Sequence, residues 1–320
     1  MRRGTLVAWV CLLIVYVVWG STYLAIRVGV ETMPPLLMAA ARNLVAGLIL
    51  FPLAMRARRT AARAVSPTLA AVPPGRLGER EGKPARAWPS RKEWLGCAIV
   101  GVLLLVANGA VGIGEQTVPS GLAALLVATV PLWLLSIDAV LNHTRLGLAP
   151  LAGLALGLAG VGLLSSFGDR SGGISVVGVV VILAAAFAWA LGTVMARRVT
   201  LPSSPALASG MQLLCGGVVL LILGTGEFGS LWLAQISGRS WLALGYLIVM
   251  GSIVAFSAYG IAIRTLPTAT VATYAYVNPV IAVLLGTLIL NERLTPAILA
   301  GGALIVGAVV LVIRRTPPPH

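Results

Sequence analysis

The chain has 320 residues, of which 58% are hydrophobic and 10% are charged, and its mean hydropathy is +0.98. Because soluble globular domains carry roughly 25% charged residues, this composition excludes a soluble protein and favours one that lies in a membrane. The formal net charge is +14, but ten of the 23 basic residues fall between Arg56 and Lys92 without a nucleic-acid-recognition motif, so we expect membrane lipid and no nucleic acid as a partner.

Ten apolar stretches are each long enough to cross about 30 Å of hydrocarbon as a helix. The expected spans lie near residues 8–29, 36–55, 94–114, 119–141, 148–166, 174–196, 205–224, 240–262, 269–290 and 295–313. The first stretch could pass for a signal sequence, but its apolar core is too long and it lacks a convincing cleavage site, so we interpret it as a helix. The fold class expected is an all-α integral membrane protein.

The chain contains two copies of one sequence pattern. Residues 116–164 align with residues 264–312 at a constant offset of 148, and the earlier parts of the two copies align at an offset of 170. Aligned pairs include Trp19 and Trp189, Arg27 and Arg197, Pro35 and Pro205, Gly47 and Gly217, Pro119 and Pro267, and Pro131 and Pro279. Each copy holds five helices, an odd number, so the second copy enters the membrane upside down. We therefore expect ten transmembrane helices in two inverted five-helix repeats, an arrangement typical of secondary transporters.

The two offsets differ by 22 residues, which places an insertion after the second helix. We expect the first repeat at 1–56 and 93–166, a basic cytoplasmic loop at 57–92, the second repeat at 174–313 and a cytoplasmic tail at 314–320. Many Arg and Pro residues with little apolar periodicity predict an unstructured, solvated loop. The loop either binds anionic lipid head groups or serves only as a linker and orientation signal.

Basic residues orient the chain, because loops rich in Lys and Arg stay in the cytoplasm. With the N-terminus inside, eight basic residues apart from the long loop fall on the cytoplasmic side, against Arg170, Arg239 and Arg293 on the other side. Both termini are therefore expected in the cytoplasm.

Polar residues in the first two helices are candidate site residues, because a polar group in lipid needs a partner or a wet cavity. The first helix carries Trp19-Gly20-Ser21-Thr22-Tyr23, whose hydroxyl groups can bind either a substrate or a neighbouring helix. The second helix carries Arg42, which aligns with Gln212 in the other copy. Arg42 either binds a substrate carboxylate or has a structural role in capping carbonyl groups.

The third and fourth helices add one amide and two carboxylates. Asn108 lies near the middle of the third helix and is the better candidate for a cavity. Glu115 lies at the outer end of that helix and Asp138 near the inner end of the next one, and either carboxylate is a candidate for proton coupling.

Matching prolines, Pro131 and Pro279, lie in the fourth and ninth helices. A proline removes a backbone donor and kinks a helix, and interrupted helices at matching places of two repeats point to a transport site. The stretch Tyr274-Ala275-Tyr276-Val277-Asn278-Pro279 sets aromatic faces and an amide beside the expected kink. This stretch either lines a cavity or forms a structural kink packed by aromatic side chains.

The residues needed for catalysis are scarce. His143 and His320 are the only histidines, and neither Lys83 nor Lys92 follows a Gly-rich phosphate loop. No histidine metal site, histidine-based catalytic group or ATP-driven motor can be built from them. We therefore expect no metal, no cofactor and no enzymatic activity.

Several motifs, taken together in order, resemble those of the EamA-type branch of the drug/metabolite transporter (DMT) superfamily, and most closely its YedA-like permeases. The motifs are Trp19-Gly20-Ser21-Thr22-Tyr23, Pro34-Pro35 followed by Arg42, Val118-Pro119-Ser120-Gly121, Ala128-Thr129-Val130-Pro131, and the Tyr274–Pro279 stretch. The resemblance covers the chain apart from the 57–92 loop, and it implies ten helices in a bacterial cell inner membrane. It also implies a central substrate cavity, lined on this chain by Trp19, Thr22, Asn108, Trp189, Tyr274, Tyr276 and Asn278.

The function expected is that of an inner-membrane secondary transporter, which exports amino acids or other small metabolites or drugs by alternating access without ATP. The alternatives are a metabolite importer and a non-transporting membrane scaffold, and the matched prolines favour transport. An integral-membrane enzyme is disfavoured, because clustered acids and histidines are lacking. Gly153 and Gly157 suit close helix packing, either within the bundle or between the subunits of a homodimer.

Overall fold

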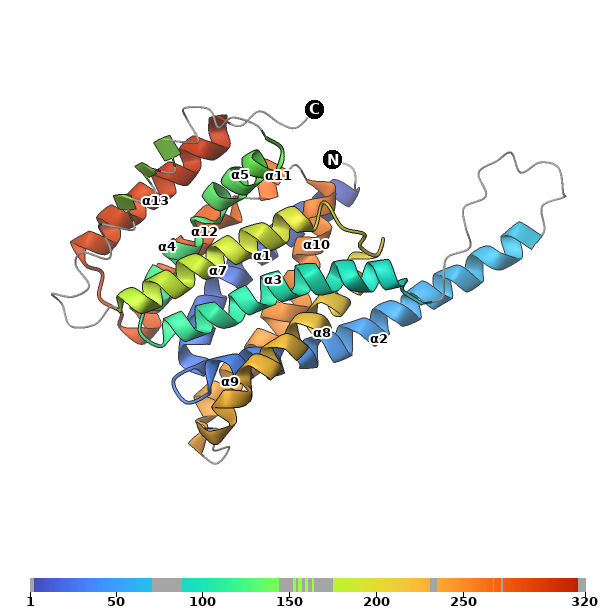
Figure 1. The fold of residues 1–320 in the computed structure, drawn as a ribbon, viewed down its shortest axis with the longest axis horizontal. Coiled ribbons are helices and arrows are strands. Elements are labelled where there is room, and N and C mark those ends of the chain that lie inside the picture. The colour runs from blue at the N-terminus through green and yellow to red at the C-terminus, as the bar shows by residue number, and fades with distance from the viewer. Residues whose placement is uncertain are drawn as a thin grey trace.

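The computed structural model describes residues 3–70, 88–143, 175–230, 235–266, 268–271 and 273–315, with scattered residues between 152 and 163 (Figure 1). Every regular element in these ranges is a helix. The first copy contains α1 (Arg3–Gly29), α2 (Pro35–Ala70), α3 (Arg91–Glu115), α4 (Ser120–Val127) and α5 (Val130–Leu141). The second copy contains α7 (Val176–Met195), α8 (Pro205–Leu223), a 3₁₀ turn η1 (Gly224–Ser230), α9 (Gly238–Tyr246), a π-helical segment η3 (Leu247–Ala255), α10 (Phe256–Thr265), α11 (Thr268–Val271), α12 (Tyr274–Leu290) and α13 (Pro296–Arg315).

Seven of the described helical stretches are long and apolar enough to cross a membrane, and two shorter apolar helices follow them. The seven are Gly4–Gly29, Pro35–Thr60, Arg91–Glu115, Ser120–Leu141, Val176–Met195, Pro205–Gly229 and Gly238–Ile263, and the shorter two are Val277–Leu290 and Ile298–Gly307. The prediction of an all-helical membrane protein is therefore confirmed. Nine of the ten expected spans overlap these helices, and most of the fifth, at 148–166, lies outside the described residues.

The second helix is longer than the sequence predicted. α2 continues to Ala70, so the expectation of unstructured chain is wrong for residues 57–70, while residues 71–87 lie outside the description. The helix continues because the segment after Arg56 is rich in Ala and Arg, which have high helix propensity. Beyond the gap, α3 begins with a capping box: the Oγ of Ser90 accepts from the N–H of Glu93, whose carboxylate accepts from the N–H of Ser90.

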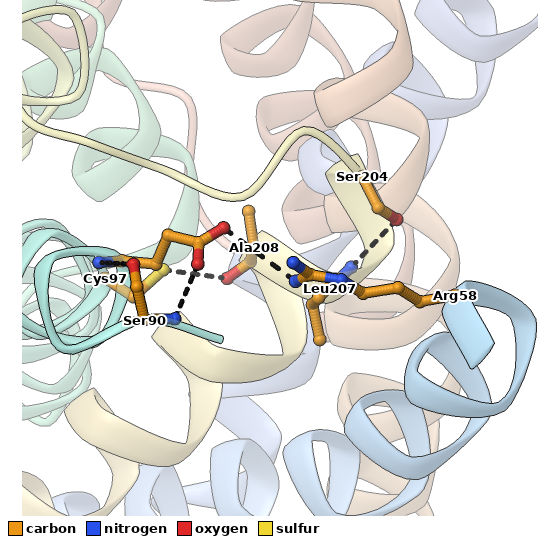
Figure 2. A network of polar contacts seen from close by, with 7 residues as sticks. Arg58, Ser90, Cys97, Ser204, Leu207 and Ala208 are labelled. Carbon is orange, nitrogen blue, oxygen red and sulfur yellow. Dashed lines mark hydrogen bonds and ion pairs between the residues drawn. The ribbon is translucent and has the colours of Figure 1, made fainter. Parts of the chain in front are cut away.

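Figure 2 shows the region where α2, α3 and α8 meet beside this cap. The Arg58 guanidinium lies 3.8 Å from the carboxylate of Glu93, and the Cys97 thiol on α3 lies 3.9 Å from the backbone carbonyl of Ala208 on α8. Ser204 caps the start of α8 by accepting from the N–H of Leu207 at 3.4 Å. The start of α3 is thus in contact with the later part of α2 through the charged pair and with the start of α8 through the buried thiol.

The two prolines at the matching position have different local structures. In the first copy the helix is interrupted between α4 and α5, and Pro131 lies in the first turn of α5, where its missing N–H leaves no intrahelical bond unmade. In the second copy Pro279 lies inside α12, and the interruption comes earlier, between Val271 and Tyr274. The prediction of matched kinks thus describes the first copy better than the second.

Aligned helices of the two copies make matching contacts where α2 packs against α8. A Cβ atom added to Gly47 would lie 2.9 Å from the Cγ of Leu214 and 3.0 Å from its backbone nitrogen. A Cβ added to Gly217, the residue aligned with Gly47, would lie 2.9 Å from the Cγ of Leu44 and 3.1 Å from its nitrogen. Leu44 and Leu214 also align at the offset of 170. These reciprocal contacts show a local two-fold relation between α2 and α8. The two helices lie side by side (Figure 1).

The two helices of this pair run antiparallel. Glu227, just after α8, accepts hydrogen bonds from the N–H groups of Leu36 and Leu37 at the start of α2, at 3.0 and 3.1 Å. Gly210, near the start of α8, faces Phe51 farther along α2. The carboxylate also occupies the helix N-terminus, where negative charge is favourable.

Candidate functional site

A central cavity of about 80 Å³ lies among α1, α2, α3, α7, η3 and α12. Six of the seven residues that the sequence predicted for a substrate site line it, namely Trp19, Thr22, Asn108, Trp189, Tyr274 and Asn278. Arg42 lines it as well. The side chain of the seventh, Tyr276, lies outside the described part of the structure. Residues scattered over the sequence are thus brought to one place between the two copies.

Arg42 forms the polar wall of this cavity. Its side chain is 5% exposed, its Nε donates to the Oγ of Ser252 at 2.7 Å, and its Nη1 donates to the Oδ1 of Asn108 at 3.0 Å. Gly251 makes room for the guanidinium, because a Cβ there would lie 2.9 Å from Nη2. None of the described residues that line the cavity is acidic. A buried positive charge with only neutral partners is costly, so the cavity favours an anion beside Arg42.

Sequence reasoning missed Ser252, the hydrogen-bond partner of Arg42. Ser252 lies in η3, where the chain between α9 and α10 adopts π-helical geometry. Such segments occur often at functional sites, because they widen the helix and redirect side chains. The signal that could have identified it was a serine next to a glycine, Gly251-Ser252, inside an apolar span.

The aromatic rings of Trp19, Trp189 and Tyr274 form another part of the cavity lining. The ring of Trp19 lies 5.8 Å from that of Trp189, 5.4 Å from that of Tyr274 and 5.0 Å from that of Tyr259, measured between centroids. The indole nitrogen of Trp19 donates to the carbonyl of Gly251 at 3.4 Å, which fixes the ring beside the Arg42 wall. Trp19 and Trp189 are aligned residues of the two copies, so the aromatic wall is built where the repeats meet.

Two polar residues complete the lining. The Thr22 hydroxyl donates to the carbonyl of Trp19 at 2.7 Å, so its oxygen remains available as an acceptor. Asn278 is 5% exposed, and in the amide orientation that satisfies both ends its nitrogen donates to the carbonyls of Tyr274 and Tyr16, each at 3.2 Å. The amide thus joins α12 to α1, which approach closely because a Cβ on Gly20 would lie 2.8 Å from the Cβ of Ile281.

The two carboxylates proposed for proton coupling lie elsewhere. Glu115 is fully buried at the end of α3, and neither of its carboxylate oxygens has a hydrogen-bond partner among the described residues. Its backbone carbonyl accepts a hydrogen bond from Arg27. The Asp138 side chain is 53% exposed and lies 4.0 Å from the Arg198 guanidinium. The described lining of the central cavity includes neither carboxylate.

A second and larger cavity, of about 490 Å³, lies among α3, α7, α8 and α10. Some of its lining residues align with residues that line the central cavity. Gln212 aligns with Arg42, Phe256 with Asn108, Thr193 with Tyr23, Ala196 with Ile26, and Tyr259 with Val111. Phe256 lines both cavities, so its ring lies at the boundary between them. We call this second space the side cavity; it was not anticipated, although the repeat alignment contained the signal for it.

Comparison with known proteins agrees with this architecture. The EamA-like transporter family matches residues 7–166 and again residues 176–314. The chain is 40% identical over 300 residues to the uncharacterized inner membrane transporter YedA of Escherichia coli K12, a match that covers 93% of this chain and 87% of that protein. It is 28% identical to the probable amino-acid metabolite efflux pump of the same organism, with 92% of this chain and 90% of that protein covered.

One solved crystal structure has the same fold, with a TM-score of 0.57 and 22% sequence identity, over 97% of this chain and 96% of the other. The two family matches coincide with the two copies found in the sequence, and they bear out the resemblance drawn from its motifs. The family is one of transporters and not of enzymes, as the lack of catalytic residues led us to expect. The chain belongs to the EamA-like transporter family, whose domain it contains twice.

Proposed function

We propose that the chain is a secondary transporter of the inner membrane, which exports amino acids or other small metabolites by alternating access. The observation that carries the proposal is the pair of cavities lined by aligned residues of the two copies. Two similar halves that exchange conformations would open one cavity while closing the other. The name of the YedA relative supports the inner membrane as the location, and the names of the efflux relatives support export.

We further propose ten helices in two inverted repeats, with 57–92 as the connection inside the first repeat and 314–320 as a tail. The antiparallel packing of α2 on α8 supports inversion, because a two-fold axis between antiparallel helices exchanges the two sides of the membrane. The distribution of Lys and Arg supports cytoplasmic termini. The side cavity then opens toward the cytoplasm, since Arg197 and the link to α8 line it.

The cargo, in this proposal, carries a carboxylate. Arg42 would bind the carboxylate, Thr22, Asn108 and Asn278 would provide hydrogen bonds, and the rings of Trp19, Trp189 and Tyr274 would contact the apolar or cationic part. Tyr276 as a further binding residue, Pro131 and Pro279 as hinges, Glu115 or Asp138 as a proton carrier and a homodimer all stay predictions.

Two other functions would use the same fold. An importer would differ only in the direction of net flux, which the coupling gradient decides. A non-transporting scaffold is less well supported, because it has no use for a buried, unneutralised arginine in a cavity between repeats.

The proposal is tested by uptake of a labelled amino-acid panel into vesicles that contain the purified protein, with and without an imposed pH gradient. We expect saturable uptake of at least one amino acid, and weaker competition from its decarboxylated amine than from the acid itself. Accumulation only with the gradient would establish proton coupling. Absence of flux for every amino acid, with the protein correctly inserted, would reject the proposed cargo.

A further inference from the structure

We propose that Arg27 and Arg197 are alternating gates. Arg27 closes one side of the molecule in this structure, and in the opposite state Arg197 closes the other side by donating to the backbone carbonyl of Ile263. The inference rests on the proposed alternating access, and it concerns how that motion is latched. The two arginines align at the offset of 170, and Ile263 aligns with Glu115 at the offset of 148.

The Arg27 contact is a closed gate between α1 and α3. Arg27 lies in the last turn of α1 and donates to the carbonyl of Glu115, the last residue of α3. The carbonyl groups at a helix C-terminus lack intrahelical partners and carry partial negative charge, so a guanidinium is a favourable partner for them. The central cavity, which is lined by Ile26, the residue before Arg27, is small, about 80 Å³.

At the aligned place in the second copy, the end of α7 and α10 lie apart across a cavity. Arg197 and Ile263 both line the side cavity, which is about 490 Å³. Ile263 lies in the last turn of α10, so its carbonyl is also near a helix C-terminus. The second copy thus has both groups of the proposed gate, the guanidinium of Arg197 and the carbonyl of Ile263, on residues that line the larger of the two cavities.

Two aligned glycines show which contacts differ between the copies. A Cβ on Gly112 would lie 3.5 Å from Pro35 and 3.7 Å from Ile26 on α1. A Cβ on Gly260 would lie 3.3 Å from Pro205, the residue aligned with Pro35, but Ala196, aligned with Ile26, has no atom within 4 Å.

The packing of α3 on α2 is therefore repeated by the packing of α10 on α8. The end of α1 also contacts α3, whereas Ala196, just after the end of α7, does not contact α10 at Gly260. Exchanging the conformations of the copies would bring the Arg197 end of α7 onto α10. The two copies supply, in one structure, the closed and the open form of the same gate.

The test uses disulfide cross-linking of the full chain in membrane vesicles, with Cys11, Cys97 and Cys215 replaced by Ser. The pair Ile26→Cys and Gly112→Cys reports closure of the Arg27 side, and the pair Ala196→Cys and Gly260→Cys reports closure of the Arg197 side. We expect both pairs to cross-link, because the protein samples both states. Arg197→Ala should slow the 196–260 cross-link about tenfold, the loss expected for a hydrogen bond from a charged donor, and Arg27→Ala should accelerate it.

Controls separate the gate from general damage. The 26–112 pair should still cross-link fully in Arg197→Ala, which a misfolded protein would not do, and Arg197→Lys should retain most of the 196–260 rate because an ammonium can also donate to the carbonyl. An unchanged 196–260 rate in Arg197→Ala, or no 196–260 cross-link under any condition, would overturn the proposal. The assay needs no cargo, so alternating cross-links without flux would reject only the proposed cargo and leave the gate standing.

Discussion

Replacing Gly47 or Gly217 with alanine should destabilise the protein equally. The added Cβ meets a leucine Cγ at 2.9 Å in both places and a leucine backbone nitrogen at 3.0 Å for Gly47 and 3.1 Å for Gly217. These distances are below van der Waals contact, and the backbone atom cannot move without shifting its helix. Overpacking of this kind costs about 1–3 kcal/mol. The double variant should cost less than the sum of the two, because one separation of α2 from α8 relieves both clashes.

The assay is unfolding of the purified protein in mixed micelles, followed by circular dichroism as the denaturing detergent increases. Gly245→Ala is the matched control, since this glycine lies in α9 and has nothing within 4 Å of an added Cβ. It records the gain of about 1 kcal/mol in helix propensity, which the other two variants share. If one substitution costs at least 1 kcal/mol more than the other, the two contacts are not equivalent and the two-fold reasoning is wrong. If the two costs simply add, the clashes are relieved separately and the shared separation of α2 from α8 is wrong.

Three further predictions concern the site and its support. Arg42→Gln should leave folding intact, since an amide can still bind Asn108 and Ser252, but lower the flux of carboxylate cargo at least tenfold while sparing the matching amines, measured by vesicle uptake. Asn278→Leu should reduce flux at least tenfold without changing membrane insertion, and normal flux would remove the amide from the site. Glu292 accepts from the backbone N–H and hydroxyl of Ser120 and from the N–H of Gly121, so Glu292→Gln should lower the free energy of unfolding by about 1–2 kcal/mol, and an unchanged unfolding curve would show that the cap contributes nothing.

The sequence predicted the helices and most of the cavity lining, because both depend on patterns that the membrane enforces. Apolar length decides which segments span, and polar groups within those segments must face a partner or a cavity. Asn108 was identified as a cavity candidate on that ground, and the resemblance to the family implied the rest of the lining, including Trp19 and Asn278. The resemblance also implied Trp189, which aligns with Trp19 in the other copy.

Other features could not be read from the sequence. The choice between a structural and a binding role for Arg42 required its partners, and Ser252 lies 210 residues away along the chain. The extent of α2 beyond residue 56 depended on helix propensity, which the high charge of the segment obscured. The location of the break in the second copy, ahead of Tyr274 and not beside Pro279, depends on how α12 packs against α1 and α4.

The binding chemistry has diverged between the copies, although the packing of α2 against α8 remains reciprocal. Arg42 and its two hydrogen-bond partners, Asn108 and Ser252, have uncharged or apolar counterparts in the side cavity. Arg42 aligns with Gln212, Asn108 with Phe256, and Ser252 with Leu104. The side cavity therefore has an amide and no guanidinium at the position aligned with Arg42, and the guanidinium that does line it, that of Arg197, aligns with Arg27.

Duplicated packing, as in the matched Gly47 and Gly217 contacts, gives two halves of nearly equal shape, which an exchange of conformations requires. Divergence at these three positions then leaves the set of Arg42, Asn108 and Ser252 in one cavity only, so the two copies do not offer two equivalent binding sites. In the proposed transport cycle one binding site is enough, because the exchange of conformations depends on the packing that the two copies share, and binding depends on the residues in which they differ.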